Sequence, residues 1–243
     1  MGTGTIENYE GYVIRLAPYR ENDAMITFLT ADRVLSFCAR GVRKPTAKNH
    51  AITTPLAKLR ISLSESASGT NLKECQWLAY PDPADQFLRA AVLSFLAELT
   101  AKMLPGEEPR ELYPWLEGAM NALEDPKGSA WTIALIYLAQ SLRLSGYGLA
   151  VDGCVICGRK TDIVGISYDE GGYLCRNDIR SDLDRRDART LKIIRYIFRL
   201  SVSDISRIAF SPEECRPLLF ELASYLGEVT GIALHSLSLL KKA

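Results

Sequence analysis

The sequence predicts a multi-domain α and β chain, in which a small β-barrel precedes an α-helical domain with an inserted cysteine module. Three observations predict this fold. Apolar residues alternate through the first eighty positions, they recur at helical spacing farther on, and three of the six cysteines lie close together in the second half. We expect the barrel at 1–80, the helical domain at 81–150 and 187–243, and the cysteine module at 151–186.

Period-two alternation predicts five short strands in the barrel domain. In the first, Tyr12, Ile14 and Leu16 alternate with Val13 and Arg15. Five strands in about 80 residues fit a small closed barrel such as an OB-fold better than a sandwich, which usually needs about seven strands or more. The strand segments are 12–16, 24–28, 34–41, 57–63 and 71–78, with a longer polar connection at 43–54.

The boundary after the barrel is Pro81-Asp82-Pro83, because neither a strand nor a helix interior tolerates that spacing of prolines. Apolar residues at helical spacing then predict five helices. Ser129 is the expected N-cap of the third helix, and Ser211-Pro-Glu-Glu214 is a capping box at the start of the fifth. The helical segments are 87–103, 109–123, 130–144, 191–198 and 212–226.

Charge is sorted along the chain although the net charge is zero. Residues 31–60 hold seven bases and one acid, whereas residues 82–125 hold nine acids and three bases. Clustered bases beside a barrel rich in aromatic residues suit a nucleic-acid groove, because cations neutralise phosphates and exposed rings stack on bases. We expect most of the rings in the core, and the alternative for the bases is a solvated charged loop. The candidate DNA-binding residues are Arg40, Arg43, Lys44, Lys48, Lys58 and Arg60.

A second basic segment follows the cysteine module, where acids interrupt the bases. It fits a solvated surface and a second nucleic-acid patch equally well. Its bases include Arg176, Arg180, Arg185, Arg186 and Arg189.

The cysteine module has the spacing of a two-knuckle metal site. Cys154-Val-Ile-Cys157-Gly158 is a C-x2-C-G turn, and seventeen residues separate Cys157 from Cys175. The second half reads Cys175-Arg-Asn-Asp178, in which aspartate replaces a fourth cysteine. A carboxylate oxygen can ligate zinc, so we predict one structural Zn²⁺ held by Cys154, Cys157, Cys175 and Asp178. Cys215, Asp152 or a water could instead supply the fourth ligand, and the alternative to any metal is a knuckle that folds without one.

Several classes of protein are disfavoured. The sequence has two histidines and lacks the P-loop, nucleophile-elbow, zincin and dinucleotide-binding motifs, which makes an enzyme the weaker class. The longest apolar run, 130–139, is half of the roughly 20 residues that a membrane span requires. The scattered cysteines make a poor disulfide framework, so we expect a cytoplasmic protein without a membrane partner.

The amino-terminal residues resemble the start of the RecO family of recombination mediators. The resemblance is carried by Glu10-Gly-Tyr-Val-Ile-Arg-Leu-Ala-Pro-Tyr-Arg-Glu21-Asn22-Asp23, then Ile26-Thr-Phe-Leu-Thr30 and Ala39-Arg-Gly-Val-Arg43. The order of barrel, helices and zinc-finger-like insert is similar to that family across essentially the whole chain. Asp178 departs from the family's common fourth cysteine, a difference that concerns the affinity for metal and not the fold.

The resemblance implies a DNA-repair protein that binds single- and double-stranded DNA in the nucleoid and anneals complementary strands. Its implied partners are RecR and single-strand-binding protein, and through them RecA. The resemblance implies a DNA-binding role for Arg40, Arg43, Lys44 and Lys48. Two rival interpretations are a zinc-dependent nucleic-acid enzyme and an OB-fold adaptor that binds no DNA.

Overall fold

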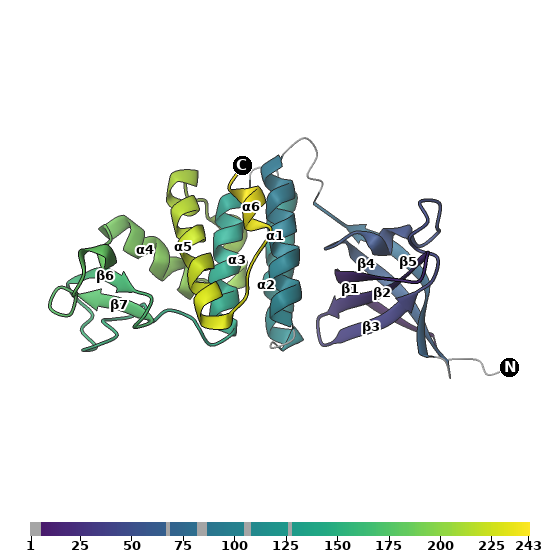
Figure 1. Cartoon of the computed structure of the whole chain (residues 1–243), viewed down its shortest axis with the longest axis horizontal. Helices are drawn as coiled ribbons and strands as arrows, with labels where there is room; N and C mark the ends of the chain where they lie inside the picture. Colours follow the sequence, from purple (N-terminus) through teal and green to yellow (C-terminus); the bar gives the residue numbers. More distant parts are fainter. Residues whose placement is uncertain (1–5, 67–68, 82–86, 105–107, 126–127) are drawn as a thin grey trace. The chain divides into compact units, whose positions relative to one another are not determined.

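The structure is a computed structural model that describes residues 6–66, 69–81, 87–104, 108–125 and 128–243 (Figure 1). The chain divides into two units, Met1–Met120 and Asn121–Ala243. The first unit holds the barrel, α1 and most of α2, and the second holds the remaining helices and the cysteine module. In the predicted boundary, Asp82 and Pro83 lie outside the described residues.

Five strands form a closed barrel in the order β1-β2-β3-β5-β4, which confirms the predicted OB-type architecture (Figure 1). β3 and β5 pair in parallel at Cys38 and Asn71, and the other neighbours are antiparallel. Closure removes the exposed sheet edges that would otherwise pair with other chains. The strands are β1 (Ile6–Tyr19), β2 (Asp23–Thr30), β3 (Val34–Ala39), β4 (Lys58–Ser66) and β5 (Gly69–Ala79).

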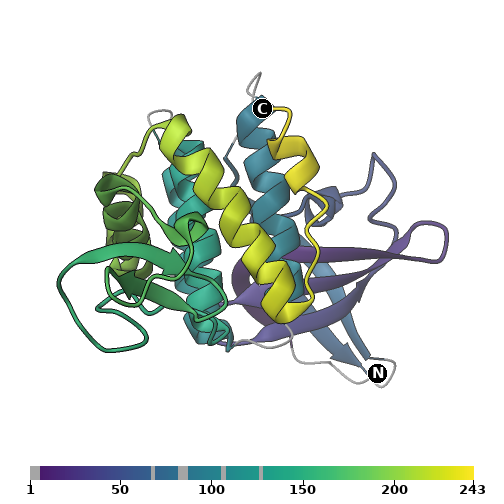
Figure 2. The same ribbon diagram turned by 60° about the vertical axis from the view of Figure 1, so that its left-hand side comes forward.

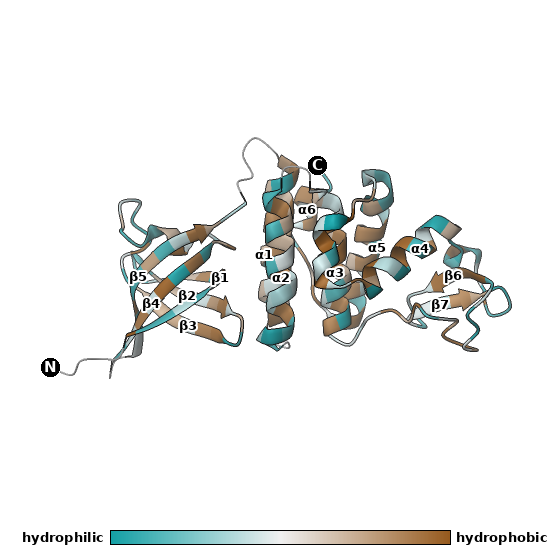
Figure 3. Cartoon of the chain, turned by 180° about the vertical axis from the view of Figure 1, so that it is seen from behind, coloured by the Kyte–Doolittle hydropathy of each residue, from teal (hydrophilic) through white to brown (hydrophobic). Residues whose placement is uncertain are grey.

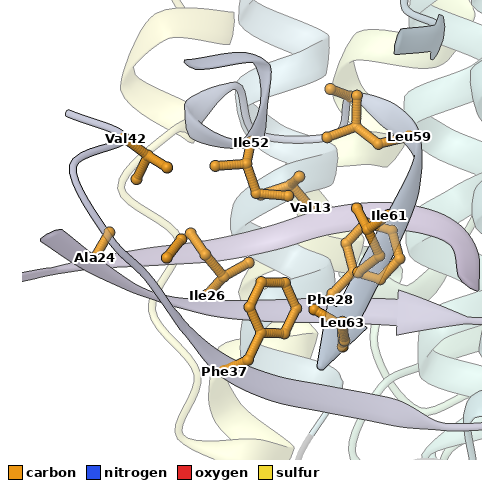
Figure 4. Close-up of a cluster of buried hydrophobic side chains, with 12 residues drawn as sticks. Val13, Ala24, Ile26, Phe28, Phe37, Val42, Ile52, Leu59, Ile61 and Leu63 are labelled. Atoms are coloured by element: carbon orange, nitrogen blue, oxygen red, sulfur yellow. The ribbon is translucent and has the colours of Figure 1, made fainter. Parts of the chain in front are cut away.

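The barrel interior is an apolar cluster drawn from several strands and one connection (Figure 4). Ile26 and Phe28 of β2 and Leu59 and Ile61 of β4 point inward, as their alternation predicts, and hydrophobic and hydrophilic segments alternate along the strands in Figure 3. Ile52 also enters this core from a 3-10 turn (His50–Thr53) inside the long polar connection. Burying such a side chain stabilises a fold by about 1.5–3 kcal/mol.

β1 departs from simple alternation, because Tyr12, Val13 and Ile14 are all buried. Val13 belongs to the barrel core, while the Tyr12 ring packs on Tyr113 of α2 (Pro109–Glu124) with centroids 5.7 Å apart. α1 (Phe87–Met103) also contacts β1. Both faces of this strand are therefore covered, and a register shift between Val13 and Arg15 changes which face each residue meets.

All five predicted helices are present. Ser129 accepts a hydrogen bond from the Thr132 N–H at the start of α3, and Ser211 and Glu214 form the capping box of α5. The four-residue helix α6 and the 3-10 turns were not predicted. The remaining helices are α3 (Ala130–Leu144), α4 (Ala188–Arg199), α5 (Pro212–Thr230) and α6 (Leu237–Leu240).

In the second unit, α3 is buried from Ala130 to Leu142 and contacts α4 and α5 (Figure 2). A helix that is apolar all round belongs in the centre of a bundle. Gln140 on α3 donates from Nε2 to the carbonyl of Ile197 on α4 at 2.5 Å, which fixes the two helices at this point. Among the described helices, none combines the length and the apolar character needed to cross a membrane.

Candidate nucleic-acid interface and metal site

The segment that follows β3 folds back on the turn between β1 and β2. Asp23 Oδ1 accepts from the Gly41 N–H at 2.8 Å, and the Arg43 guanidinium donates to the Glu21 carbonyl at 3.0 Å. Gly41 has a φ of 66°, in the left-handed region that glycine adopts most readily. These contacts hold the two loops together at one end of the barrel.

A pocket of about 430 Å³ lies at this end, between the β1–β2 turn, β3 and the start of β5. The Arg20 guanidinium lies 5.2 Å from the centroid of the Tyr19 ring, and Tyr19 is 44% exposed. OB-folds bind oligonucleotides on the face of strands 2 and 3 and at the loops after strands 1 and 4, where this pocket lies. Its lining includes Tyr19, Arg20, Met25, Arg40, Thr70 and Asn71.

The six predicted DNA-binding bases divide into two groups. Arg40, Arg43 and Lys44 are exposed and form no ion pair with any described residue. The other three are paired with carboxylates: Lys48 with Glu74 at 3.0 Å, Lys58 with Glu117 at 2.7 Å and Arg60 with Glu10 at 2.6 Å. Of the six, Arg40 lines the pocket beside the β1–β2 turn and Arg43 donates a hydrogen bond to that turn. A DNA contact by any of the six stays a prediction.

Tyr19 and Arg20 are candidate site residues that the charge pattern did not single out. Arg20 lies outside the densest run of bases, and its left-handed φ of 55° shows that it occupies a tight turn. Most barrel rings were expected in the core, and Phe28 and Phe37 are indeed buried there, but Tyr19 is not. The position of the first hairpin turn in an OB-fold is the signal that identifies these residues.

The second basic segment is largely neutralised by acids. Arg185 pairs with Asp182 at 2.8 Å. Two further bases of this segment pair with α5, Arg186 with Glu221 at 3.3 Å and Arg189 with Glu214 at 2.6 Å. Only Arg176 and Arg180 of the five named bases lack an ion pair with a described residue.

The cysteine module is a hairpin of β6 (Ile163–Ser167) and β7 (Gly172–Cys175) flanked by two tight turns. In the first turn, the Cys154 N–H donates to the Arg159 carbonyl at 2.7 Å, and Gly158 adopts a φ of 75°. In the second, the Asp178 N–H donates to the Cys175 carbonyl at 3.1 Å. Each turn directs two ligand side chains toward the same point.

Cys154, Cys157, Cys175 and Asp178 place their ligand atoms within 4.8 Å of one another. The Sγ atoms of Cys157 and Cys175 lie 3.7 Å apart, and Asp178 Oδ2 lies 3.1 Å from Sγ of both Cys154 and Cys175. Thiolates about 2.3 Å from a tetrahedral zinc lie about 3.8 Å apart, so the sulfur spacing fits such an ion. The cluster could therefore bind a metal ion.

The other proposed fourth ligands lie outside this cluster. Cys215 is buried in α5, where its Sγ lies 3.6 Å from Thr132 Oγ1. Asp152 pairs with Arg195 and Arg199 on α4. Asp178 is thus the carboxylate that the structure brings to the three thiols.

Hydrogen bonds between thiols and carboxylate shift the pKa values of the cluster. Thiol donors, with Cys157 foremost, lower the pKa of Asp178 to about 2, and the same bond raises the pKa of Cys157 to about 12. Burial raises the pKa of Cys154, but backbone N–H donors outweigh burial and leave that pKa below its ordinary value. Metal binding requires these thiols to release their protons, so affinity for a metal rises with pH.

Comparison with known proteins covers nearly the whole chain. The family model described as "Recombination protein O N terminal" matches residues 5–81, and "Recombination protein O C terminal" matches residues 84–238. The resemblance seen in the amino-terminal residues is therefore confirmed across both halves.

Among curated proteins, a DNA repair protein RecO of Bifidobacterium animalis is 27% identical over 221 residues, covering 89% of this chain and 92% of the relative. A protein of the same name from Exiguobacterium sibiricum is 27% identical over 240 residues, covering 95% and 94%. One from Halalkalibacterium halodurans is 25% identical over 236 residues, covering 93% and 91%. With two family models matched over residues 5–81 and 84–238 and a five-stranded barrel ahead of a helical domain, the chain belongs to the RecO family of DNA repair proteins.

Proposed function

We propose that this chain is a recombination mediator that binds single- and double-stranded DNA and anneals complementary single strands. With RecR, it helps RecA load on DNA coated by single-strand-binding protein. The observation that supports this proposal most directly is the barrel pocket, whose lining includes Arg20, Arg40 and the exposed Tyr19. We place this activity in the bacterial cytoplasm on the nucleoid, because its substrate is chromosomal DNA.

The chemistry of the pocket suits a single strand. Guanidinium groups neutralise phosphates and release counterions, and an exposed aromatic ring offers a stacking surface to a base of any sequence. Annealing then requires only that two strands be held near each other with their phosphate repulsion offset. No bond is made or broken by the protein, so we propose a mediator and not an enzyme.

The cysteine cluster supports a structural role in this proposal. Catalytic zinc sites keep three protein ligands and one open position, whereas this cluster offers four ligand atoms. We propose that Cys154, Cys157, Cys175 and Asp178 hold one Zn²⁺, which when bound cross-links the two turns and contributes folding free energy. The module at 151–186 then acts as an insert in a helical domain formed by 81–150 and 187–243, which follows a DNA-binding barrel at 1–80 in the sequence.

The test is annealing of complementary oligonucleotides, each coated with single-strand-binding protein, followed by fluorescence energy transfer between the strands. The wild-type chain should accelerate duplex formation over the coated strands alone. An Arg20→Gln, Arg40→Gln variant should bind DNA roughly tenfold more weakly, equivalent to about 1.4 kcal/mol, and lose most of the acceleration.

The matched control is Arg33→Gln with Lys73→Gln, which removes two exposed bases of the same barrel that do not line the pocket. This control should anneal like the wild type. If the wild-type chain gave no acceleration at any ratio to DNA, the mediator proposal would be wrong. If it accelerated annealing but both variants behaved alike, the barrel pocket would not be the binding site.

A further inference from the structure

A second basic groove lies in the second unit, between the cysteine module and α4. It consists of two adjoining pockets of about 390 and 490 Å³ that share Asp152, Lys192 and Arg195. We call it the α4 groove and define it by Asp152, Lys160, Lys192, Arg195, Tyr196 and Arg199.

Helical spacing and one tertiary contact bring these residues together. Lys192, Arg195 and Arg199 are three and four positions apart on α4, so they lie on the same side of the helix. Lys160 comes from the segment just after the first cysteine turn and lines the first pocket with Lys192. Tyr173 on β7 donates its hydroxyl to the Leu191 carbonyl, which ties the module to α4 at this place.

The groove carries an excess of positive charge. Four cations meet one carboxylate in its lining, so its formal charge is +3. Asp152 is already shared between Arg195 and Arg199, with Nε of Arg199 at 3.1 Å and Nη2 of Arg195 at 3.5 Å. Lys160 and Lys192 are exposed and form no ion pair with any residue that the structure describes. Like charges held together in a cleft attract an anionic ligand.

The remaining lining indicates which anion fits. Ile163 and Leu191 give the first pocket apolar walls, and Tyr196, which lines the second pocket together with Arg195 and Arg199, is 43% exposed. Bases interleaved with an exposed ring are typical of sites that bind single-stranded nucleic acid, in which cations take the phosphates and the ring takes a base. A compact inorganic anion would leave the ring unused.

We propose that the α4 groove binds the phosphodiester backbone of a second single strand, while the barrel pocket binds the first. This inference rests on the proposed function, because annealing requires two strands on one mediator. It assigns the second-strand site to Lys160, Lys192, Arg195 and Arg199, and Tyr196 stacks on a base of that strand.

The experiment counts strands. A short fluorescent oligothymidine is titrated into the full chain, with the protein concentration held well above the dissociation constant of the protein for this oligonucleotide. Fluorescence anisotropy then gives the number of oligonucleotides bound per protein chain. The wild type should bind two strands. A Lys160→Gln, Lys192→Gln variant should bind one strand tightly and the second at least tenfold more weakly, and the salt slope for the second strand should fall by about 1.4, or about 0.7 for each lost phosphate contact.

The matched control is Lys241→Gln with Lys242→Gln, which removes the same charge from exposed lysines of the same unit. This control should still bind two strands. One strand per wild-type chain, or equal behaviour of the groove variant and the control, would overturn the inference. A third outcome would also overturn it: an acidic peptide binds the wild type but not the groove variant, while the groove variant still binds two strands. That outcome would assign the groove to a protein partner.

The barrel variant Arg20→Gln, Arg40→Gln separates the two proposals. If that variant binds only one strand, and this strand occupies the α4 groove, the result supports both proposals. Full retention of two strands there would contradict the barrel assignment alone, because the groove result is measured on a different variant. Thermal unfolding of every variant checks that each chain is folded.

Discussion

Lys58 of β4 and Glu117 of α2 form an ion pair in which Nζ lies 2.7 Å from Oε1, so the pair fastens the helix to the outside of the barrel. Lys58 Nζ also lies 5.8 Å from the centroid of the Tyr12 ring, and Glu117 accepts from the Tyr113 hydroxyl at 3.2 Å. Burial, followed by the charge of Glu117, raises the pKa of Tyr113. Lys58 is thus engaged in a half-buried network.

Replacing Lys58 with methionine should destabilise the chain by about 1 kcal/mol, because it leaves the carboxylate of Glu117 partly buried without its cation. Urea unfolding of the full chain measures the change. Arg60→Met is the matched control on the same strand, since its pair with Glu10 is half exposed and should contribute less than about 0.5 kcal/mol. Equal losses in the two variants would contradict a special role for the Lys58 pair.

Arg40 and Lys58 should differ in their effect on DNA binding. Arg40→Gln should make the slope of log affinity against log salt shallower by about 0.7 for single-stranded DNA, because one phosphate contact is lost. Lys58→Met should leave that slope unchanged, because its ammonium already neutralises Glu117. Fluorescence anisotropy over a series of salt concentrations measures both. A larger slope change for Lys58 than for Arg40 would refute this division of the basic residues.

Loss of a cluster ligand should release metal and lower stability. Cys157→Ser should abolish stoichiometric zinc in elemental analysis, and it should reduce the free energy of unfolding by about 4 kcal/mol where zinc is present at 1,000 times its dissociation constant. Asp178→Cys should retain zinc, since a fourth thiolate is also a suitable ligand. Cys38→Ser, in the barrel, is the control and should keep its metal. If the wild-type protein contained no zinc after growth and dialysis in the presence of zinc, the result would support the alternative that the cysteine turns fold without metal.

Alkaline pH should destabilise the chain partly through Cys215. Burial raises the pKa of this thiol from 9.0 to about 11, against a smaller opposite effect of Thr132, so the folded state favours the neutral form. The resulting stability is fully present below pH 9 and is lost as pH rises through about 11. Cys215→Ala should reduce this loss by about 1–2 kcal/mol after allowance for solvent screening. Thermal unfolding between pH 8 and pH 11 measures it, and an unchanged pH profile in Cys215→Ala would contradict the assignment.

The sequence was sufficient for features that depend on neighbours along the chain. Alternation in β2 and β4 identified inward residues, and the capping box at Ser211 located the start of α5. The spacing of Cys154, Cys157 and Cys175 identified the metal-type cluster, because each turn places its own ligands.

Features that depend on distant neighbours were not predictable. Glu10, Glu74 and Glu117 determine which of the predicted DNA-binding bases are engaged in ion pairs. Glu117 lies 59 residues along the chain from its partner Lys58. The burial of Tyr12 depends on a helix farther along the chain. The α4 groove escaped prediction for the same reason, since Lys160 and Lys192 belong to separate segments that meet only after folding.

Strand β7 carries both Cys175 of the cluster and Tyr173, whose hydroxyl binds the α4 carbonyl next to Lys192. The cluster and the groove therefore share one short piece of backbone. If two ligands that act on the same element are energetically coupled, that coupling is reciprocal. If zinc at the cluster raises the affinity of the groove for a DNA strand by some factor, the strand must raise the affinity of the cluster for zinc by the same factor. A nucleic acid would then lower the fraction of zinc that a chelator removes at equilibrium, and the cluster would bind zinc most tightly while the groove holds DNA.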